Sequence, residues 1–149
     1  MVRGNLRRQY SEVHLASSSP EETVLMLYDG AIRFLKEAMG EIVGENIVAK
    51  VNLLGKVEKI IEYLQSCLDR EKGGEIAENL HRLYDYMLIR LTEANLYNDI
   101  AKLEEIGKLL GTVREGWASI CDAARKAQET KVSHQERDSA VPKNITISV

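Results

Sequence analysis

The sequence contains few residues that could cross-link the chain or hold a metal ion. Its 149 residues include two cysteines and three histidines. Cys67 and Cys121 both fall on apolar faces of predicted helices, where a thiol usually behaves as a small buried hydrophobe. A disulfide is the less favoured alternative, because only two cysteines are present and the expected compartment is reducing.

Long apolar runs and an excess of one charge are also absent. No stretch approaches the roughly 20 apolar residues that span a bilayer, and Met1 is not followed by a signal-peptide core. The net charge of −3 gives no basic surface for nucleic acid. We therefore expect a cytoplasmic protein without membrane insertion or nucleic-acid binding.

The remaining composition is that of a globular protein. Hydrophobic residues make up 44% of the chain and charged residues 29%, and both values lie close to globular averages. A chain of this length can bury roughly two thirds of its unfolded surface around one core. The composition therefore indicates one independently folding domain.

The first predicted helix begins at residues 19–22, Ser-Pro-Glu-Glu. This segment supplies a capping hydroxyl, a proline at the first helical position and a glutamate at the capping-box position. Gly40 and Gly44 end the helix. The second helix runs from its cap Asn46 to about Arg70, where glycines break the chain again.

The third and fourth helices span about residues 75–97 and 99–127. In the fourth helix, apolar residues alternate steps of three and four, which is the a/d pattern of a bundle or coiled coil. Four helices with short connections predict an all-α, antiparallel, up-down-up-down four-helix bundle.

The ends of the chain are more polar than the predicted bundle. Residues 1–18 are expected to form a flexible N-terminal arm, and residues 19–127 the bundle domain. Residues 128–149 are expected to form a flexible polar tail with Pro142 as a further helix breaker.

The second and third helices carry wide apolar faces. On the second helix the arc runs from Val51 round to Ile60 and Cys67, and covers roughly 200°. A similar arc on the third helix runs from Leu88 round to Tyr86. One interpretation is that these helices lie deep between their neighbours. The other is that the outer edge of each arc lines a groove for an apolar helix of a partner.

Glycines on the fourth helix admit two interpretations. Gly107, Gly111 and Gly116 each cost roughly 1 kcal/mol relative to alanine in a helix interior. The fourth helix could use them to pack closely against the first. Alternatively, a partner or the N-terminal arm could lie across this face, and the sequence does not separate the two.

Enzymatic sites find little support in the sequence. Glu78 and His81 have the Glu-x-x-His spacing of di-iron bundles. Such a site needs a second pair, which His14 and His134 do not provide, so a surface histidine is favoured. Phosphate-binding loops, nucleophile elbows, Cys-x-x-Cys and His-Glu-x-x-His motifs are absent. We therefore expect neither an enzyme nor a cofactor or metal site.

Three segments carry a family resemblance. They are residues 19–30 (SPEETVLMLYDG), 83–87 (LYDYM) and 91–95 (LTEAN), with Trp117 near the end of the fourth helix. In this order and spacing they resemble FliS-type flagellar secretion chaperones, over about residues 10 to 125. The tail beyond about Lys126 exceeds the usual family length.

The resemblance implies a bundle chaperone of the bacterial cytosol. Members of this family bind the disordered C-terminal segment of flagellin, which wraps around the bundle partly as helices in hydrophobic grooves. This binding prevents premature polymerisation until the client is delivered to the type III export apparatus. The family's N-terminal arm, with a tyrosine matched by Tyr10, packs on the empty bundle and is implicated in contact with the export gate.

Nine residues are the predicted partner-binding set. Asn95 is expected to satisfy backbone groups of the client, and the apolar members to exclude water from it. The main alternative to client binding is a helical bundle that forms a homodimer through the same surface. A third hypothesis is a metal-dependent oxidase. The set comprises Tyr10, Ile60, Leu64, Cys67, Leu68, Tyr84, Leu88, Leu91 and Asn95.

A hypothesis about the tail yields a first testable prediction. Ile145, Ile147 and Val149 alternate like a strand, so the tail could occupy a vacant groove of the bundle. Deleting residues 128–149 should then tighten flagellin binding in calorimetry, because a competing segment is removed. Unchanged affinity would rule the hypothesis out.

Overall fold

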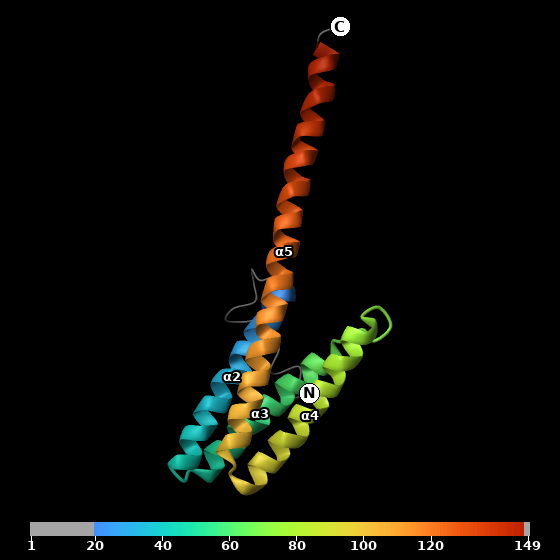
Figure 1. Ribbon diagram of the computed structural model, residues 1–149. Helices are drawn as coiled ribbons and strands as arrows, with labels where there is room; N and C mark the ends of the chain where they lie inside the picture. The colour runs from blue at the N-terminus through green and yellow to red at the C-terminus, as the bar shows by residue number, and fades with distance from the viewer. Residues whose placement is uncertain (1–19, 148–149) are drawn as a thin grey trace. The chain divides into compact units, whose positions relative to one another are not determined.

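The computed structural model describes residues 20–147, apart from the side chains of residues 120–125, 128 and 134–147. No strand occurs among the described residues, which confirms the all-α class. Predictions about Ser19 and the N-terminal arm lie outside this range. The helices are α2 (Pro20–Val43), α3 (Ile47–Ser66), α4 (Gly74–Tyr97) and α5 (Ile100–Ile147) (Figure 1).

The chain divides into two compact units, residues 1–114 and 115–149. In the first unit, successive helices run in opposite directions, so α2 and α4 point one way while α3 and the first part of α5 point the other (Figure 1). This arrangement confirms the predicted up-down-up-down order. In the second unit, the described backbone is a helix.

Helix α5 extends beyond its predicted end. The sequence predicts that the fourth helix ends near residue 127, whereas the helical backbone continues to Ile147. Residues 128–140 contain no glycine or proline and include several strong helix formers, so no breaker stops the helix there. The division into arm, bundle domain and tail stays a prediction.

Local signals set the other helix ends close to where the sequence predicts them. Asn46 caps α3, since its Oδ1 accepts a hydrogen bond from the Ala49 amide at 3.3 Å. Asn98 ends α4 in the left-handed conformation, with φ of 52°. Helix α3 ends at Ser66, a few residues before the predicted Arg70.

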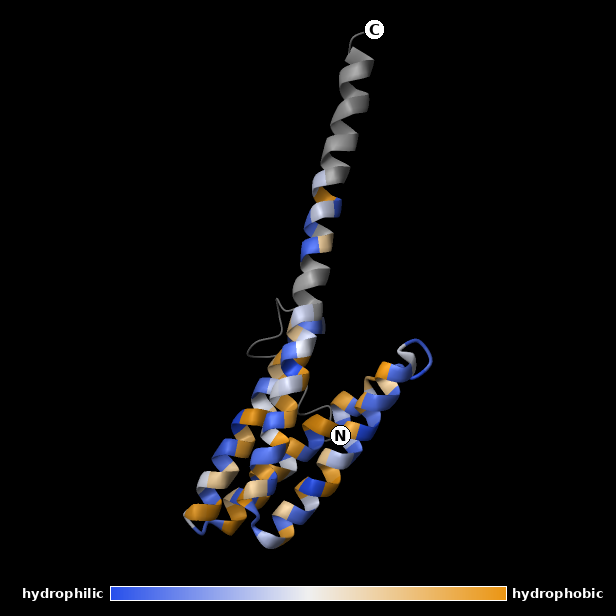
Figure 2. Cartoon of the chain, viewed as in Figure 1, coloured by the Kyte–Doolittle hydropathy of each residue, from blue (hydrophilic) through white to orange (hydrophobic). Residues whose placement is uncertain are grey.

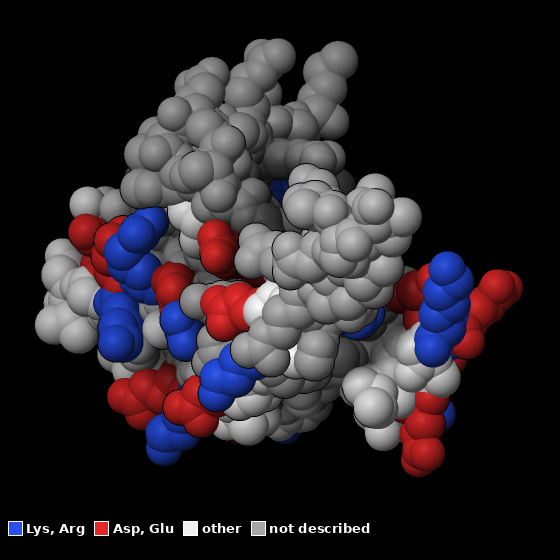
Figure 3. Space-filling view, turned by 90° about the horizontal axis from the view of Figure 1, so that it is seen from above, with Lys and Arg blue, Asp and Glu red and all other residues white. Residues whose placement is uncertain are grey.

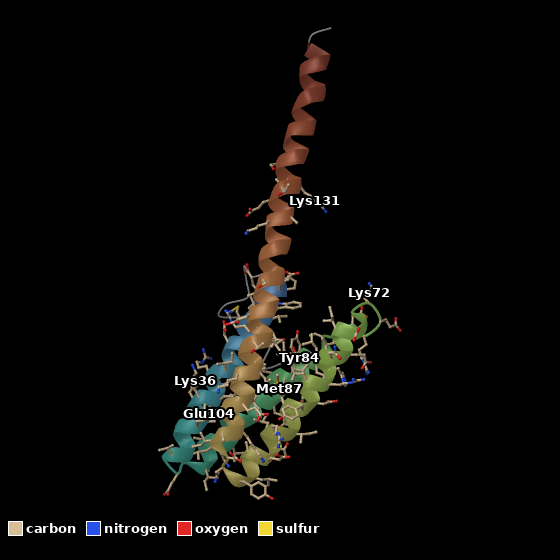
Figure 4. All side chains as sticks on the ribbon, in the orientation of Figure 1. Lys36, Lys72, Tyr84, Met87, Glu104 and Lys131 are labelled. Atoms are coloured by element: carbon tan, nitrogen blue, oxygen red, sulfur yellow. The ribbon has the colours of Figure 1, made fainter. Side chains whose placement is uncertain are left out.

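The core of the first unit is built from one apolar stripe on each helix. Tyr84 and Met87 lie on the side of α4 that faces the other helices (Figure 4). Val51, at one end of the predicted apolar arc of α3, is exposed, as are Ile47 and Ile76. The buried apolar residues are Leu27, Tyr28, Ala31, Leu35 and Ala38 of α2, Leu54, Val57, Ile60, Ile61 and Leu64 of α3, Ala77, Tyr84, Met87, Leu91 and Ala94 of α4, and Leu103, Ile106 and Leu110 of α5.

Two buried tyrosines join α2 to α4. Tyr28 and Tyr84 are almost fully buried, and their hydroxyl groups form a hydrogen bond with each other. Burial raises the pKa of both phenols, because the charged form would lose its hydration. Pairing the two hydroxyls reduces the cost of placing polar atoms in the core.

Hydrogen bonds at both ends of α3 fix its position against α4. The Lys50 ammonium, 4% exposed, donates to the Asn95 carbonyl at 2.8 Å and to Asn98 Oδ1 at 2.7 Å. It thereby stabilises the negative end of α4. Near the other end, Gln65 Nε2 donates to the His81 carbonyl at 3.1 Å and to Asp85 Oδ1 at 2.7 Å.

A polar network links α4 to α5. The Glu93 carboxylate accepts from Lys102 Nζ at 2.7 Å and from Arg90 Nη1 at 2.9 Å. The Tyr86 hydroxyl donates to the Glu105 carboxylate on α5. The bond from Lys102, followed by that from Arg90, holds the pKa of the Glu93 carboxyl below its ordinary value of 4.5.

The lowered pKa of Glu93 predicts an acid-dependent contribution to stability. Its contribution is present above pH 4.5 and is lost as the pH falls through the folded-state pKa, because the protonated acid no longer holds two cations. At pH 7, the midpoint of urea unfolding of Glu93→Gln should lie at a lower urea concentration than that of wild type. At pH 3, the difference between the two midpoints should be smaller. The same difference between the midpoints at pH 7 and pH 3 would contradict this role of the Glu93 carboxylate.

The burial of Leu64 predicts a structural role for this side chain. Leu64→Ala should lower the free energy of unfolding by about 2–5 kcal/mol, because it leaves a cavity in the core. Leu96→Ala, at an exposed position, is the matched control and should change it by no more than about 0.5 kcal/mol. Equal urea midpoints for the two variants would show that Leu64 lies outside the core.

Candidate partner-binding surface

Four of the predicted partner-binding residues lie inside the bundle. Ile60, Leu64, Tyr84 and Leu91 are all buried core residues. Their apolar surface is already covered by neighbouring helices of the same chain, and none of them is open to a partner in this structure. Their contact with a client stays a prediction.

The other members of the predicted set lie nearer the surface. Leu68, Leu88 and Asn95 are half-buried, and Cys67 is exposed just beyond the end of α3. Leu88 and Asn95 share one face of α4 with the buried Tyr84 and Leu91, because these positions are separated by three or four residues. Tyr10 lies outside the described residues.

The structure exposes a different set of apolar side chains on the same two helices. On α3 these include Val48 and Val51, and on α4 they include Ile89 and Leu96. Ile47, Ile76, Tyr86 and Tyr97 are exposed as well. On α3, the sequence predicts the width of the apolar arc but not which edge is covered. The edge with Ile60 is buried, and the edge with Val51 is left open.

Residues of α3 and α4 meet to form one outward surface. On α3, positions 51, 55, 58, 62 and 65 are separated by three or four residues and share a face, as do positions 85, 89, 92 and 96 on α4. The hydrogen bond between Gln65 and Asp85 joins the two faces. We define the α3–α4 surface as Val48, Val51, Gly55, Glu58 and Glu62 of α3 with Asp85, Ile89, Thr92 and Leu96 of α4.

Gly55 lies in the middle of the α3 half of this surface. A Cβ atom added at Gly55 would meet none of the described residues within 4 Å, so packing against them does not require glycine there. An alanine would favour the helix by roughly 1 kcal/mol. Without a side chain at this position, we expect a partner to be able to approach the α3 backbone closely between Val51 and Glu58.

Charge is unevenly distributed over the α3–α4 surface. Its exposed valines and Leu96 lie toward one end, whereas Glu58, Glu62 and Asp85 lie toward the other. Both signs of charge are otherwise interspersed on the face of the molecule seen in Figure 3. An exposed surface with apolar and acidic parts suits an amphipathic partner segment.

The structure tests whether close packing explains the glycines of α5. A Cβ atom added at Gly107 would lie 3.9 Å from Leu35 Cδ1 on α2, which is an ordinary contact. Atoms added at Gly111 and Gly116 would meet none of the described residues within 4 Å. Packing against the described residues therefore does not require glycine at any of the three positions.

The described residues contain no group of three or more potential metal ligands. Glu78 is engaged by the Arg70 guanidinium, and His81 Nδ1 lies 3.5 Å from Asp85 Oδ2. Both members of the Glu-x-x-His pair therefore take part in polar contacts between side chains. Among the described helices, none combines the length and apolar character needed to cross a bilayer.

Comparison with known proteins identifies the family. The family model described as "Flagellar protein FliS" matches residues 3–124, so residues 125–149 lie beyond the match. The flagellar secretion chaperone FliS of Salmonella typhimurium is 44% identical over 114 residues, covering 76% of this chain and 84% of the relative. The flagellar secretion chaperone FliSB of Pseudomonas aeruginosa is 40% identical over 117 residues, covering 76% and 93%.

A solved structure supports the fold. The chain resembles a protein described as "Crystal structure of flagellar chaperone from bacteria" with a TM-score of 0.66, covering 80% of this chain and 97% of that chain. At 18% identity this likeness concerns the fold alone. The family match and the curated relatives also identify the type of protein, which is a chaperone and not an enzyme. The chain belongs to the FliS family of flagellar secretion chaperones.

Proposed function

We propose that this chaperone binds the disordered C-terminal segment of flagellin in the bacterial cytosol. Binding keeps the segment from polymerising and delivers it to the flagellar type III export apparatus. The observation that carries the proposal is the α3–α4 surface, which leaves large apolar side chains in water on two neighbouring helices. A closed bundle without a partner gains nothing from exposing them.

The shape of the α3–α4 surface suits a client helix. Two parallel rows of side chains, one from each helix, can hold an amphipathic helix that presents apolar residues every three or four positions. At Gly55 such a helix could approach α3 more closely than elsewhere. Ile89 and Leu96 would then contribute most of the buried apolar area on the α4 side.

The partner-binding residues predicted from sequence have different roles in this proposal, according to how deeply each is buried. Leu88, Leu68 and Asn95 would line the inner edge of the client site, because they are half-buried. Leu64, Tyr84 and Leu91 would support that edge from the core, whereas Ile60 lies on the opposite, covered edge of α3. Tyr10 would contact the export gate or the empty bundle through the N-terminal arm. Exposed Cys67 would lie at the margin of the site.

Polar substitutions on the α3–α4 surface should separate binding from stability. The double variant Ile89→Ser/Leu96→Ser should weaken flagellin binding by about tenfold or more, since it removes two buried apolar side chains from the complex. Its melting temperature should stay close to that of wild type, because both side chains are exposed in the free protein. Calorimetric titration and thermal unfolding measure the two effects.

Ile76→Ser provides the matched control for this experiment. Ile76 is 74% exposed and Leu96 is 71% exposed on the same helix, but Ile76 lies outside the α3–α4 surface. Its substitution should leave flagellin affinity unchanged. If both variants bind flagellin as tightly as wild type, the surface is not the client site. If instead the double variant abolishes a wild-type homodimer and leaves flagellin binding intact, the surface joins two copies of the chain.

A further inference from the structure

An open cavity of about 510 Å³ lies at the turn between α2 and α3. Val43 and Val48 beside it are exposed, and hydrophobic residues gather at this turn in Figure 2. The cavity adjoins the α3–α4 surface, because Ile47 in its wall and Val51 on that surface lie one turn apart on the same face of α3. The residues that line it are Glu41, Ile42, Glu45, Ile47, Lys50 and Asn98.

Glu41 is placed where a negative charge costs stability. It lies in the last turn of α2, and this turn contains no basic residue. The C-terminal end of a helix carries partial negative charge, so cations are favoured there and carboxylates are not. Within the described part of the chain, Glu41 forms no ion pair that would offset this cost.

Glu45 is placed where glycine or asparagine would be favoured. Its φ of 58° is in the left-handed region, which a residue with a long side chain rarely adopts. Like Glu41, it has no ion-pair partner among the described residues. Neither the helix end nor the turn therefore explains why two carboxylates line this cavity.

Lys50 does not neutralise the cavity fully. Its ammonium group donates hydrogen bonds to Asn95 and Asn98 at the end of α4. The lining has a net charge of −1, because it contains two carboxylates and this one ammonium group. The isoleucines of the wall add apolar surface beside the charge. A flexible cation on an aliphatic stem would complement both features.

We propose that this cavity receives a lysine or arginine side chain of the bound flagellin segment. The ammonium or guanidinium group pairs with Glu41 and Glu45, while its methylene stem and the neighbouring apolar residues of the client cover Ile42 and Ile47. This inference rests on the proposed function, and it adds a charge requirement to client recognition. Continuity with the α3–α4 surface lets one client segment fill both sites.

The test measures calorimetric binding of flagellin to Glu41→Gln/Glu45→Gln. This variant should bind about tenfold more weakly than wild type, and added salt should weaken its binding less steeply. Its melting temperature should stay close to that of wild type, since the unfavourable charge of Glu41 at the end of α2 is removed together with that of Glu45, which precedes the start of α3. In addition, changing one particular lysine or arginine of the flagellin C-terminal segment to glutamine should weaken binding to wild type but not to the double variant.

Glu71→Gln/Glu75→Gln is the control, because it removes the same charge from exposed positions at the start of α4 and the loop before it. It should bind flagellin like wild type. Equal affinity of wild type and Glu41→Gln/Glu45→Gln would overturn the inference and leave the proposed function standing. Failure of wild type itself to bind flagellin would overturn both.

Discussion

The hydrogen bonds that hold α3 against α4 determine what this chaperone can present to a partner. Buried Lys50 ties the start of α3 to the end of α4, and Gln65 ties the end of α3 to the middle of α4. Sliding α3 by one turn would separate the ammonium from the carbonyl that it caps. The resulting register brings Val51 level with Leu96 and so creates one continuous surface from two helices.

Sequence reasoning predicted the helices better than it predicted the surface. Capping residues such as Asn46 and breakers such as Gly44 act locally, so helix starts and the order of the bundle could be inferred from them. The covered edge of α3 could not be inferred, because it depends on how closely α2 packs against the side with Ile60. The continuation of α5 to Ile147 was missed because a polar composition was taken as a sign of flexibility, although residues 128–140 themselves favour helix. The expectation that Pro142 breaks a helix was wrong, because the helical backbone continues through it.

The binding proposal explains several features that reduce stability. Gly55 costs roughly 1 kcal/mol of helix propensity, and a left-handed Glu45 costs roughly 1–2 kcal/mol. Exposed Leu96 and Ile89 add a risk of aggregation. All four residues lie on or beside the α3–α4 surface, whereas the core beneath it is closed by well-buried side chains and the Tyr28–Tyr84 pair is satisfied. These features lower the stability of the free chaperone, and binding of a client would offset the loss.

Side-chain footprinting of the chaperone with and without flagellin tests the central claim most directly. Hydroxyl-radical labelling reports which exposed side chains a bound client covers, without any substitution in the chain. The proposal predicts that flagellin protects Val51, Ile89 and Leu96 and leaves Ile76 as reactive as in the free protein. Protection of Ile76 with undiminished labelling of Ile89 and Leu96 would contradict it.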